Sequence, residues 1–399
     1  MNKSKTLYIV GNITLPNVDA GATRVLELSK GFKPYFDNIV IAGKYNKDPH
    51  NLYDYDEKIK FLPYHLDKTK NVIDKINLIF RPKKLIINDL KKCYEEFDIT
   101  HILIYSALEV RAAKRIRKFA KKNNINILFD VVEFQTLSNQ TLSSFFTFYL
   151  MNVYTNKHLI KRGDNVISIS SFLNSYFLSR GCNSVTIPFV FDTKSINYDD
   201  KKDYNDHLNL MYAGSPKKRK DLLVNSIEGL YLLPEDARKK VRYQIAGISK
   251  DSFVKEYRGI AKKIDFNDGV LKFYNHISKD DVKKLYNQSD FSILIRDSMN
   301  RISKAGFPTK VSESLAHGVP VICNLTSDLS DFLKGDYNSL LMINDSPEEF
   351  ARCVALALQK NHSELIELRK NARNTSVEKL DINLFDSSIR KVLKLERIK

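Results

Sequence analysis

The chain has 399 residues, more than one ordinary hydrophobic core holds, so we expect two domains. Its 64 Lys and Arg residues against 47 Asp and Glu residues give a formal net charge of +17, which predicts an anionic partner: a phosphorylated substrate, an anionic lipid surface or a nucleic acid. The 4 cysteines have no paired spacing, and no segment approaches the roughly 20 apolar residues of a spanning helix, which argues against a disulfide framework, a zinc site and a membrane-spanning protein.

Apolar strands alternate with helical segments through the first half of the chain, which is typical of a parallel sheet. The first expected strand, 7–10, ends at Gly11, and the loop after it leads to a helix from about Arg24 to Phe32. Gly11 and Gly21 do not complete a G-x-G-x-x-G fingerprint, so no dinucleotide site is predicted. Gly21 is a candidate for close backbone approach to a ligand, with an ordinary turn glycine as the alternative. Further strands are expected at 38–42, 59–62, 99–105, 125–131, 165–170 and 185–189.

The first half of the chain has two acidic features, of which one is a candidate for chemistry. The strand at 125–131 places Asp130 and Glu133 toward its carboxyl end, where α/β proteins build their sites. Glu133 is therefore a candidate functional carboxylate, and a structural glutamate is the alternative. Asp54 and Asp56 form a D-Y-D sequence in a polar loop and not at a strand end, so we reject them as metal ligands. No other cluster of metal ligands is evident, and we expect no metal.

Two segments of the first half are strongly basic. Residues 68–92 interleave eight Lys and Arg residues with apolar ones, and the helix expected at 107–122 carries seven basic residues from Arg111 onward. Basic amphipathic helices of this kind lie on anionic membrane surfaces, although an ordinary solvated helix face has the same pattern.

The polar stretch 194–206 predicts a linker between an N-terminal domain, 1–193, and a C-terminal domain, 207–375, which is followed by a last helical segment, 376–399. Within the second domain we expect strands at 208–213, 241–247, 270–276, 290–295, 319–323 and 338–343, and a helix at 346–359.

The strand at 208–213 ends in the turn Gly214–Ser215–Pro216, and a run of four cations that includes Lys218 and Lys220 follows. A helix is expected directly after this run. A glycine turn between a strand and a helix N-terminus is an arrangement that binds phosphate, and the cations strengthen it.

A second arrangement of this kind follows the strand at 290–295. Pro308 is placed to open a helix, because Pro is tolerated at the first helical position, and Gly318 is placed at its left-handed C-terminal cap. Thr309 and Lys310 then lie in the first turn. Free backbone N–H groups and the helix dipole at this position favour an anion.

Glu313 lies one turn deeper in the same helix, where a carboxylate can accept two hydroxyl hydrogen bonds from a ribose. A plain β-α-β crossover with a solvated lysine and glutamate is the alternative interpretation.

The sequence P-T-K-x-x-E at 308–313, with the small-residue helix and the G-V-P-V-I strand behind it, resembles the donor-sugar motif of glycosyltransferase family 4, in the form found among surface-polysaccharide enzymes. That motif has two glutamates separated by seven residues. Glu313 matches the second, which holds the nucleotide ribose in the family, and Ala305 occupies the place of the first, which holds the sugar. The turn after 208–213 resembles the family's pyrophosphate clamp, with Ser215 in place of the usual Arg and with Lys218 or Lys220 matching the Lys.

The resemblance implies an α/β protein of the GT-B fold, with two Rossmann-like domains that face a central cleft and a C-terminal helix that crosses back to the N-terminal domain. It implies a retaining, hexosyltransferase-like enzyme that moves a sugar from a nucleotide-sugar, expected to be a UDP-sugar, to a glycan or lipid-linked glycan in bacterial-type surface-polysaccharide synthesis. Donor-binding residues would be Gly21, Gly214, Ser215, Lys218, Lys220, Thr309, Lys310 and Glu313. Glu133 and Lys310 are the candidate catalytic residues.

Two other functions remain open: a basic membrane- or nucleic-acid-associated binding protein, and a sugar-nucleotide epimerase on the same fold. The chain has no Trp and no RNA-binding signature, so we expect no nucleic-acid partner. The apolar stretch near the N-terminus is too short for a signal peptide, so we expect a cytoplasmic protein, with a peripheral position at the inner membrane face as a further prediction.

Overall fold

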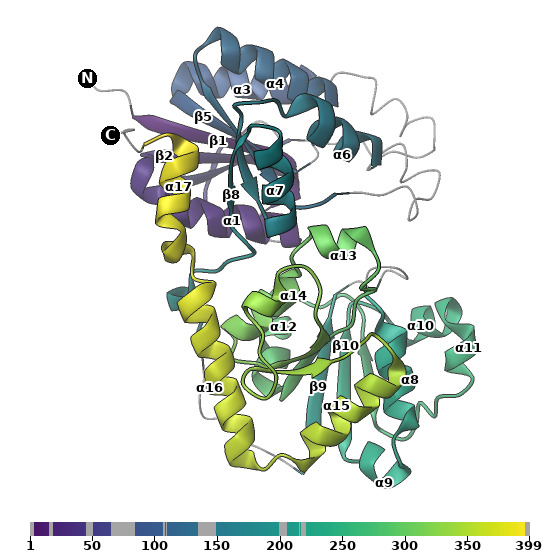
Figure 1. Ribbon diagram of the computed structural model, residues 1–399. Helices are drawn as coiled ribbons and strands as arrows, with labels where there is room; N and C mark the ends of the chain where they lie inside the picture. Colours follow the sequence, from purple (N-terminus) through teal and green to yellow (C-terminus); the bar gives the residue numbers. More distant parts are fainter. Residues whose placement is uncertain are drawn as a thin grey trace. The chain divides into compact units, whose positions relative to one another are not determined.

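The computed structural model describes residues 4–15, 19–44, 51–64, 84–106, 108, 110–134, 149–198, 206–214, 216 and 221–395. The chain forms two compact units. The first comprises Met1–Val190, Ala305–Phe307 and Ile382–Lys399, and the second comprises Phe191–Lys304 and Pro308–Asp381. Each unit is a mainly parallel sheet with helices on both faces (Figure 1), so the predicted α/β fold class is confirmed.

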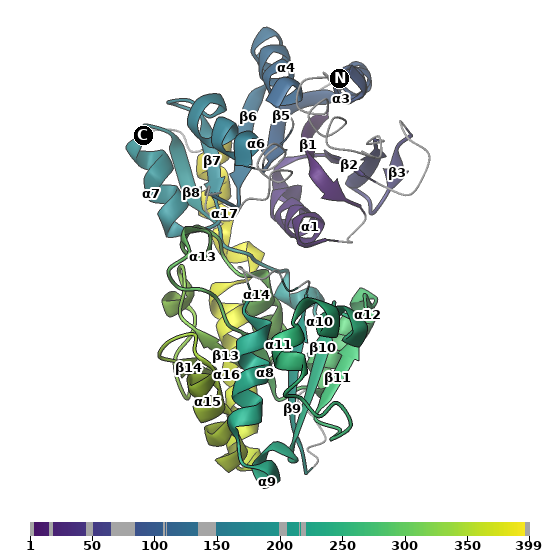
Figure 2. The ribbon, with the colours of Figure 1, turned by 90° about the vertical axis from the view of Figure 1, so that its right-hand side faces the viewer.

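The first sheet has the strand order β3-β4-β2-β1-β5-β6-β7-β8. All neighbouring strands are parallel except β3, which runs antiparallel to β4. Figure 2 shows β1 between β2 and β5. The chain therefore adds β2, β3 and β4 on one side of β1 and β5 to β8 on the other side. The strands are β1 (Lys5–Thr14), β2 (Asn38–Lys44), β3 (Tyr53–Asp54), β4 (Ile59–Pro63), β5 (Asp98–Tyr105), β6 (Asn126–Val131), β7 (Asn165–Ser168) and β8 (Asn183–Thr186).

Helices cover both faces of this sheet, with α1 and α17 on one face and α3 and α4 on the other (Figure 1). The helices are α1 (Ala20–Phe32), α3 (Lys84–Glu96), α4 (Val110–Lys122), α6 (Leu150–Tyr154), α7 (Ser171–Ser179) and α17 (Asp386–Leu393). Short helical turns occur at Lys33–Tyr35, Thr155–Leu159 and Ile382–Phe385. Of the basic segment predicted at 68–92, residues 65–83 lie outside the described residues, and 84–92 belong to α3.

The helix expected from about Arg24 begins at Ala20 instead. The reason is the side chain of Asp19, which accepts a hydrogen bond from the backbone N–H of Ala22 at 2.8 Å and so caps the helix four residues earlier. The other carboxylate oxygen of Asp19 accepts from the N–H of Thr14 at 2.9 Å, which ties the helix start to the end of β1. The predicted start of this helix was therefore wrong by four residues.

The core of the first unit follows the period-2 alternation of its strands. Leu7 and Ile9 of β1 lie in one apolar cluster with Val25 of α1 and with Ile389 and Val392 of α17. The segment after Ile382 thus contributes apolar side chains to the first unit, although it is distant in sequence.

The second sheet has the strand order β11-β10-β9-β12-β13-β14, and all its neighbouring strands are parallel. The strands are β9 (Leu208–Ala213), β10 (Val241–Ala246), β11 (Leu271–Tyr274), β12 (Phe291–Leu294), β13 (Val321–Asn324) and β14 (Ser339–Met342). The helices are α8 (Leu223–Leu232), α9 (Glu235–Arg238), α10 (Lys250–Glu256), α11 (Arg258–Ala261), α12 (Lys279–Gln288), α13 (Arg301–Ala305), α14 (Thr309–Ala316), α15 (Pro347–Gln359) and α16 (His362–Lys379). Short turns occur at Thr193–Ser195 and Leu329–Asp331.

Alternation along β9 builds two apolar layers in the second unit. Leu210 and Tyr212 lie in the cluster that α8 and α15 cover, whereas Met211 lies on the opposite face, in a cluster with Leu285 and Tyr286 of α12. The two helices α8 and α15 pack against each other, and α14 packs against α16 (Figure 1).

Helix α14 begins and ends close to the predicted positions. Pro308 is its N-terminal cap and not its first helical residue, a shift of one position. At the other end Gly318 has φ +66°, and the N–H groups of Gly318 and Val319 donate to the carbonyls of Leu315 and Ser314 at 2.9 and 2.8 Å. This is the Schellman arrangement, so the predicted left-handed cap is confirmed.

All four cysteines are buried and none forms a disulfide. Within the part of the chain that the structure describes, no helix is both long enough and apolar enough to cross a membrane.

Candidate active site

The neighbouring strands β9 and β12 form a topological switch point in the second sheet. The chain continues from β9 to β10 on one side and from β12 to β13 on the other, so the loops that follow β9 and β12 diverge. Ligands of open α/β sheets bind at the carboxyl ends of strands at such a point. Gly214 follows β9 directly, and Arg296 follows β12.

Lys310, in the first turn of α14, is held at this point by an acidic and an aromatic partner. Its Nζ donates to Oδ2 of Asp221 and lies 3.9 Å from the centre of the Tyr212 ring. The hydroxyl of Tyr212 donates to the same carboxylate oxygen at 3.1 Å. Burial and the charge of Asp221 raise the pKa of Tyr212 well above its usual value, so this hydroxyl keeps its proton.

A second cation approaches Asp221 from the end of β12. Nε of Arg296 lies 3.4 Å from Oδ1 of Asp221, and both side chains are buried. The backbone of Arg296 is fixed by Asn324, whose Oδ1 accepts from its N–H at 2.9 Å and whose Nδ2 donates to its carbonyl at 2.7 Å. One carboxylate therefore holds two cations, and the cluster of Asp221, Arg296 and Lys310 carries a net positive charge.

The sequence prediction included Lys310 but missed both Asp221 and Arg296. Two signals pointed to them: Asp221 is the single acid between a run of four cations and a helix, and Arg296 directly follows the strand expected at 290–295. Neither signal shows that Asp221 pairs with Lys310, because the two residues are 89 positions apart in the sequence.

Gly214 has φ +146°, a backbone conformation that only glycine adopts without strain. A Cβ atom at this position would lie 2.5 Å from Cε and 2.6 Å from Nζ of Lys310. The glycine is therefore needed for the close approach of the Lys310 side chain. Ser215, Lys218 and Lys220, the other predicted members of the phosphate clamp, lie outside the described residues.

The N-terminus of α14 lies next to this cluster and has no side-chain cap, because its cap residue is Pro308. Thr309 is the first helical residue and is partly buried. Backbone N–H groups of a first turn without a capping side chain are available to an anion. Ala305, which occupies the place of the first glutamate of the resembled motif, is fully buried.

Glu313 lies on α14 with its carboxyl group turned toward α12. The hydroxyl of Tyr286 hydrogen-bonds to it, and among the cations Lys279 and then Lys310 act on it most strongly. Burial raises the pKa of Glu313 above its usual value, although the lysines and the tyrosine act in the opposite direction.

In the first unit, the ring of Tyr105 fills the space beside Gly21. A Cβ atom on Gly21 would lie 3.0 Å from both Cε1 and the hydroxyl oxygen of Tyr105, so the predicted close approach at this glycine is made by a side chain of the protein. Contact of Gly21 with a ligand stays a prediction. Burial and the charges of Asp130 and Glu133 raise the pKa of Tyr105.

Asp130 and Glu133 have different surroundings. Asp130 is fully buried and forms a two-pronged ion pair with Arg24, with distances of 2.8 and 2.7 Å, which gives it a structural role. Glu133 is partly exposed, and its backbone carbonyl accepts from Nδ2 of Asn152 at 3.1 Å and of Asn156 at 3.2 Å. The catalytic role predicted for the Glu133 carboxylate stays a prediction.

The rejected D-Y-D pair is engaged with lysines. Asp54 pairs with Lys60, and Asp56 pairs with Lys33 at 2.8 Å. Within the described ranges, no group of three or more His, Cys, Asp or Glu side chains could hold a metal ion.

Residues 200–376, which carry the candidate site, match the model of a family described as Glycosyl transferases group 1. The uncharacterized glycosyltransferase MJ1069 of Methanocaldococcus jannaschii is 22% identical over 234 residues, which span 57% of this chain and 57% of that protein.

Solved structures share the fold over nearly the whole chain. Sucrose-phosphate synthase from Thermosynechococcus elongatus has a TM-score of 0.70 at 12% identity, covering 98% of each chain. HepE of Anabaena in complex with UDP and glucose has a TM-score of 0.68 at 12% identity, covering 98% of this chain and 100% of that one. WaaG, a glycosyltransferase involved in lipopolysaccharide biosynthesis, has a TM-score of 0.65 at 10% identity, covering 96% and 99%. The chain has the GT-B fold of these structures, and the comparisons support a GT-B glycosyltransferase.

Proposed function

We propose that the protein is a metal-independent, retaining glycosyltransferase of family 4 that transfers a hexose-like sugar from a nucleotide-sugar to an acceptor. The observation that carries this proposal is the cluster of Lys310, Asp221 and Arg296 at the carboxyl ends of β9 and β12, beside the open N-terminus of α14. This cluster lies within the segment that matches the glycosyltransferase family.

The donor's diphosphate would bind at the N-terminus of α14, where Lys310 and the N–H groups of the first turn face it. Its negative charge grows as the glycosidic bond breaks, and fixed positive groups stabilise that charge without reorganising. Lys218 or Lys220 would complete the clamp. Glu313, one turn deeper, would accept hydrogen bonds from the ribose hydroxyls, and Glu133 would face the acceptor.

A UDP-sugar is the first donor to test, because the structure of HepE holds UDP and glucose. The acceptor we propose is a glycan or lipid-linked glycan of a bacterial-type surface polysaccharide, in line with the involvement of WaaG in lipopolysaccharide biosynthesis.

A panel of UDP-, GDP-, ADP-, CMP- and dTDP-sugars, scored by release of the nucleoside phosphate and by calorimetric binding, tests the proposal. We expect release and binding with one nucleotide class, and no loss of rate in a chelator. A sugar-nucleotide epimerase would instead convert the donor without an acceptor. Absence of both binding and turnover across the panel would overturn the proposal.

Changing Glu313 to Gln removes the charge that the ribose hydroxyls would meet while keeping the shape of the side chain. We expect donor binding to weaken by about 1.5–3 kcal/mol, the value of a hydrogen bond to a charged group. Isothermal calorimetry with UDP measures this directly. The matched control is Glu367→Gln on the exposed side of α16, which should bind UDP like the wild type. Unchanged affinity in a folded Glu313→Gln variant would remove Glu313 from the site.

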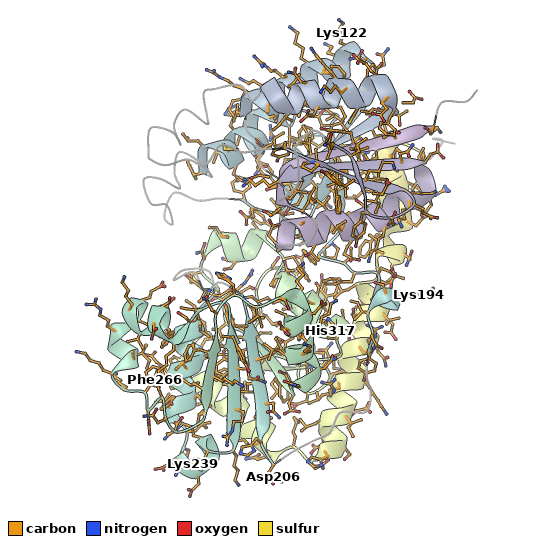
Figure 3. All side chains as sticks on the ribbon, turned by 180° about the vertical axis from the view of Figure 1, so that it is seen from behind. Lys122, Lys194, Asp206, Lys239, Phe266 and His317 are labelled. Carbon is orange, nitrogen blue, oxygen red and sulfur yellow. The ribbon has the colours of Figure 1, made fainter. Side chains whose placement is uncertain are left out.

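Helix α4 supports the peripheral-membrane part of the prediction. It buries Ala112, Ala113, Ile116 and Ala120 against the first unit. Its exposed side chains include six cations and no acid, and Lys122 projects from its end (Figure 3). The exposed cations are Arg111, Lys114, Arg115, Lys118, Lys121 and Lys122. We propose that this face holds the enzyme at an anionic bilayer, where its acceptor would be found.

Reversing the charge of Arg115, Lys118 and Lys122 to Glu should weaken co-sedimentation with phosphatidylglycerol vesicles, since each cation near an anionic surface contributes about 1 kcal/mol. Wild-type binding should grow with the phosphatidylglycerol fraction and fall with salt. The control reverses three exposed lysines of the second unit, Lys255, Lys262 and Lys263, and should pellet like the wild type. Equal pelleting of the wild type with neutral and anionic vesicles, or none with either, would contradict the membrane proposal.

A further inference from the structure

A side chain of α14 and the side chain of its C-terminal cap face helix α12. Glu313 and His317 lie four positions apart, and the backbone N–H of His317 donates to the carbonyl of Glu313 at 3.1 Å. Tyr286 of α12 meets both: its ring stacks on the imidazole of His317, with centroids 5.0 Å apart and planes 4° apart, and its hydroxyl hydrogen-bonds to Glu313. His317, labelled in Figure 3, and Tyr286 are both buried.

The position of the Tyr286 hydroxyl is fixed by packing. Tyr286 is 1% exposed; it belongs to an apolar cluster with Met211 and Leu285, and its ring stacks on the imidazole of His317. A tyrosine has two side-chain torsions, whereas a glutamate has three. A tyrosine whose ring is held by packing can therefore fix the orientation of a glutamate carboxylate that is bonded to its hydroxyl.

We propose that Tyr286 is a positioning residue for Glu313: its hydroxyl holds the carboxylate in the orientation in which its remaining lone pairs accept the ribose hydroxyls of the donor. The inference rests on the proposed function, because it requires Glu313 to bind the nucleotide. The proposed site thereby gains a residue from α12, a helix that carries none of the predicted site residues. The role assigned to His317 is to keep the tyrosine ring in place by stacking on it.

The charges around Glu313 set the direction of the pH effect. Burial raises the pKa of Glu313, while Lys310 on its own helix, Lys279 and Lys283 on α12, and the Tyr286 hydroxyl favour the ionised form. His317 adds no charge at neutral pH, because burial and nearby cations lower its pKa to about 4. Loss of the tyrosine hydroxyl therefore raises the pKa of Glu313 further.

Tyr286→Phe keeps the ring and its stacking and removes only the hydroxyl. We expect its affinity for UDP at neutral pH to fall by about 3- to 10-fold, the range of one hydrogen bond. The loss of binding at low pH should also begin at a higher pH than in the wild type, because Glu313 takes up its proton earlier. Calorimetry with UDP across pH 5 to 8 measures both effects, and protonation of UDP itself is common to the two proteins.

Tyr243→Phe is the matched control, since it removes a buried hydroxyl that lies 3.0 Å from Ser226 on the other face of the same sheet. It should leave the affinity and the pH profile unchanged. In the double variant Tyr286→Phe/Glu313→Gln, the two losses should not add, because the tyrosine acts through the glutamate.

The outcomes separate this inference from the proposed function. If Glu313→Gln binds UDP like the wild type, the proposed donor site is wrong. If Glu313→Gln weakens binding but Tyr286→Phe has wild-type affinity and an unshifted pH profile, only the positioning role is wrong. Weaker binding of Tyr286→Phe at every pH without a shift, or full additivity in the double variant, would indicate a merely structural tyrosine and would also overturn the inference.

Discussion

Changing Asp130 to Ala is expected to lower the free energy of unfolding by about 3–5 kcal/mol, because it leaves a buried guanidinium without its counter-charge. Arg24 is 2% exposed and Asp130 is fully buried. The remaining N–H groups of Arg24 donate to the carbonyls of Pro188 and Ile187 at 2.8 and 3.0 Å, so this one side chain joins α1, β6 and the segment after β8. Arginine cannot give up its proton to escape the penalty. Urea denaturation followed by circular dichroism measures the change.

Two further variants control this experiment. Lys30→Ala removes a cation from the same helix, but its pair with Glu27 is partly exposed, so its cost should stay below about 1 kcal/mol. The double change Arg24→Met and Asp130→Leu removes both charges, and it should recover much of the stability that Asp130→Ala loses. If Asp130→Ala lowers the free energy of unfolding no more than Lys30→Ala does, the ion pair of Arg24 and Asp130 does not stabilise the first unit.

Changing Lys310 to Ala is expected to lower the rate of sugar transfer by about 100- to 1,000-fold, the usual effect of removing one fixed group that stabilises developing charge. Stability should change much less, because Asp221 keeps Arg296 and the hydroxyl of Tyr212 as partners. Steady-state release of the nucleoside diphosphate, compared with the melting temperature, separates the two effects.

The control for Lys310 is Lys304, an exposed lysine in the helix just before α14. Lys304→Ala removes the same charge outside the cluster of Asp221, Arg296 and Lys310, so it should keep the wild-type rate. A rate for Lys310→Ala within about threefold of the wild type would be far from the size expected of a charge-stabilising group, and it would place the phosphate elsewhere.

Local patterns in the sequence determined much of the second unit. Apolar runs marked β9, β12 and β13, and Pro308 and Gly318 bracketed α14 to within one residue. These features are readable because strand burial, helix start and left-handed caps depend on residues within a few positions of one another. The basic, amphipathic character of α4 was readable for the same reason.

Only the tertiary structure decided which side chains meet. Strand order places β9 beside β12, and so brings Asp221 to Lys310 across 89 positions of sequence. The sheet of the first unit brings Arg24 to Asp130 across 106 positions, which turned a candidate site residue into half of a buried ion pair. The packing of α12 on α14 likewise joins Tyr286 to Glu313. Such pairs leave no local signal, because they result from the summed packing of whole helices and strands, in which each residue contributes a small part of the free energy.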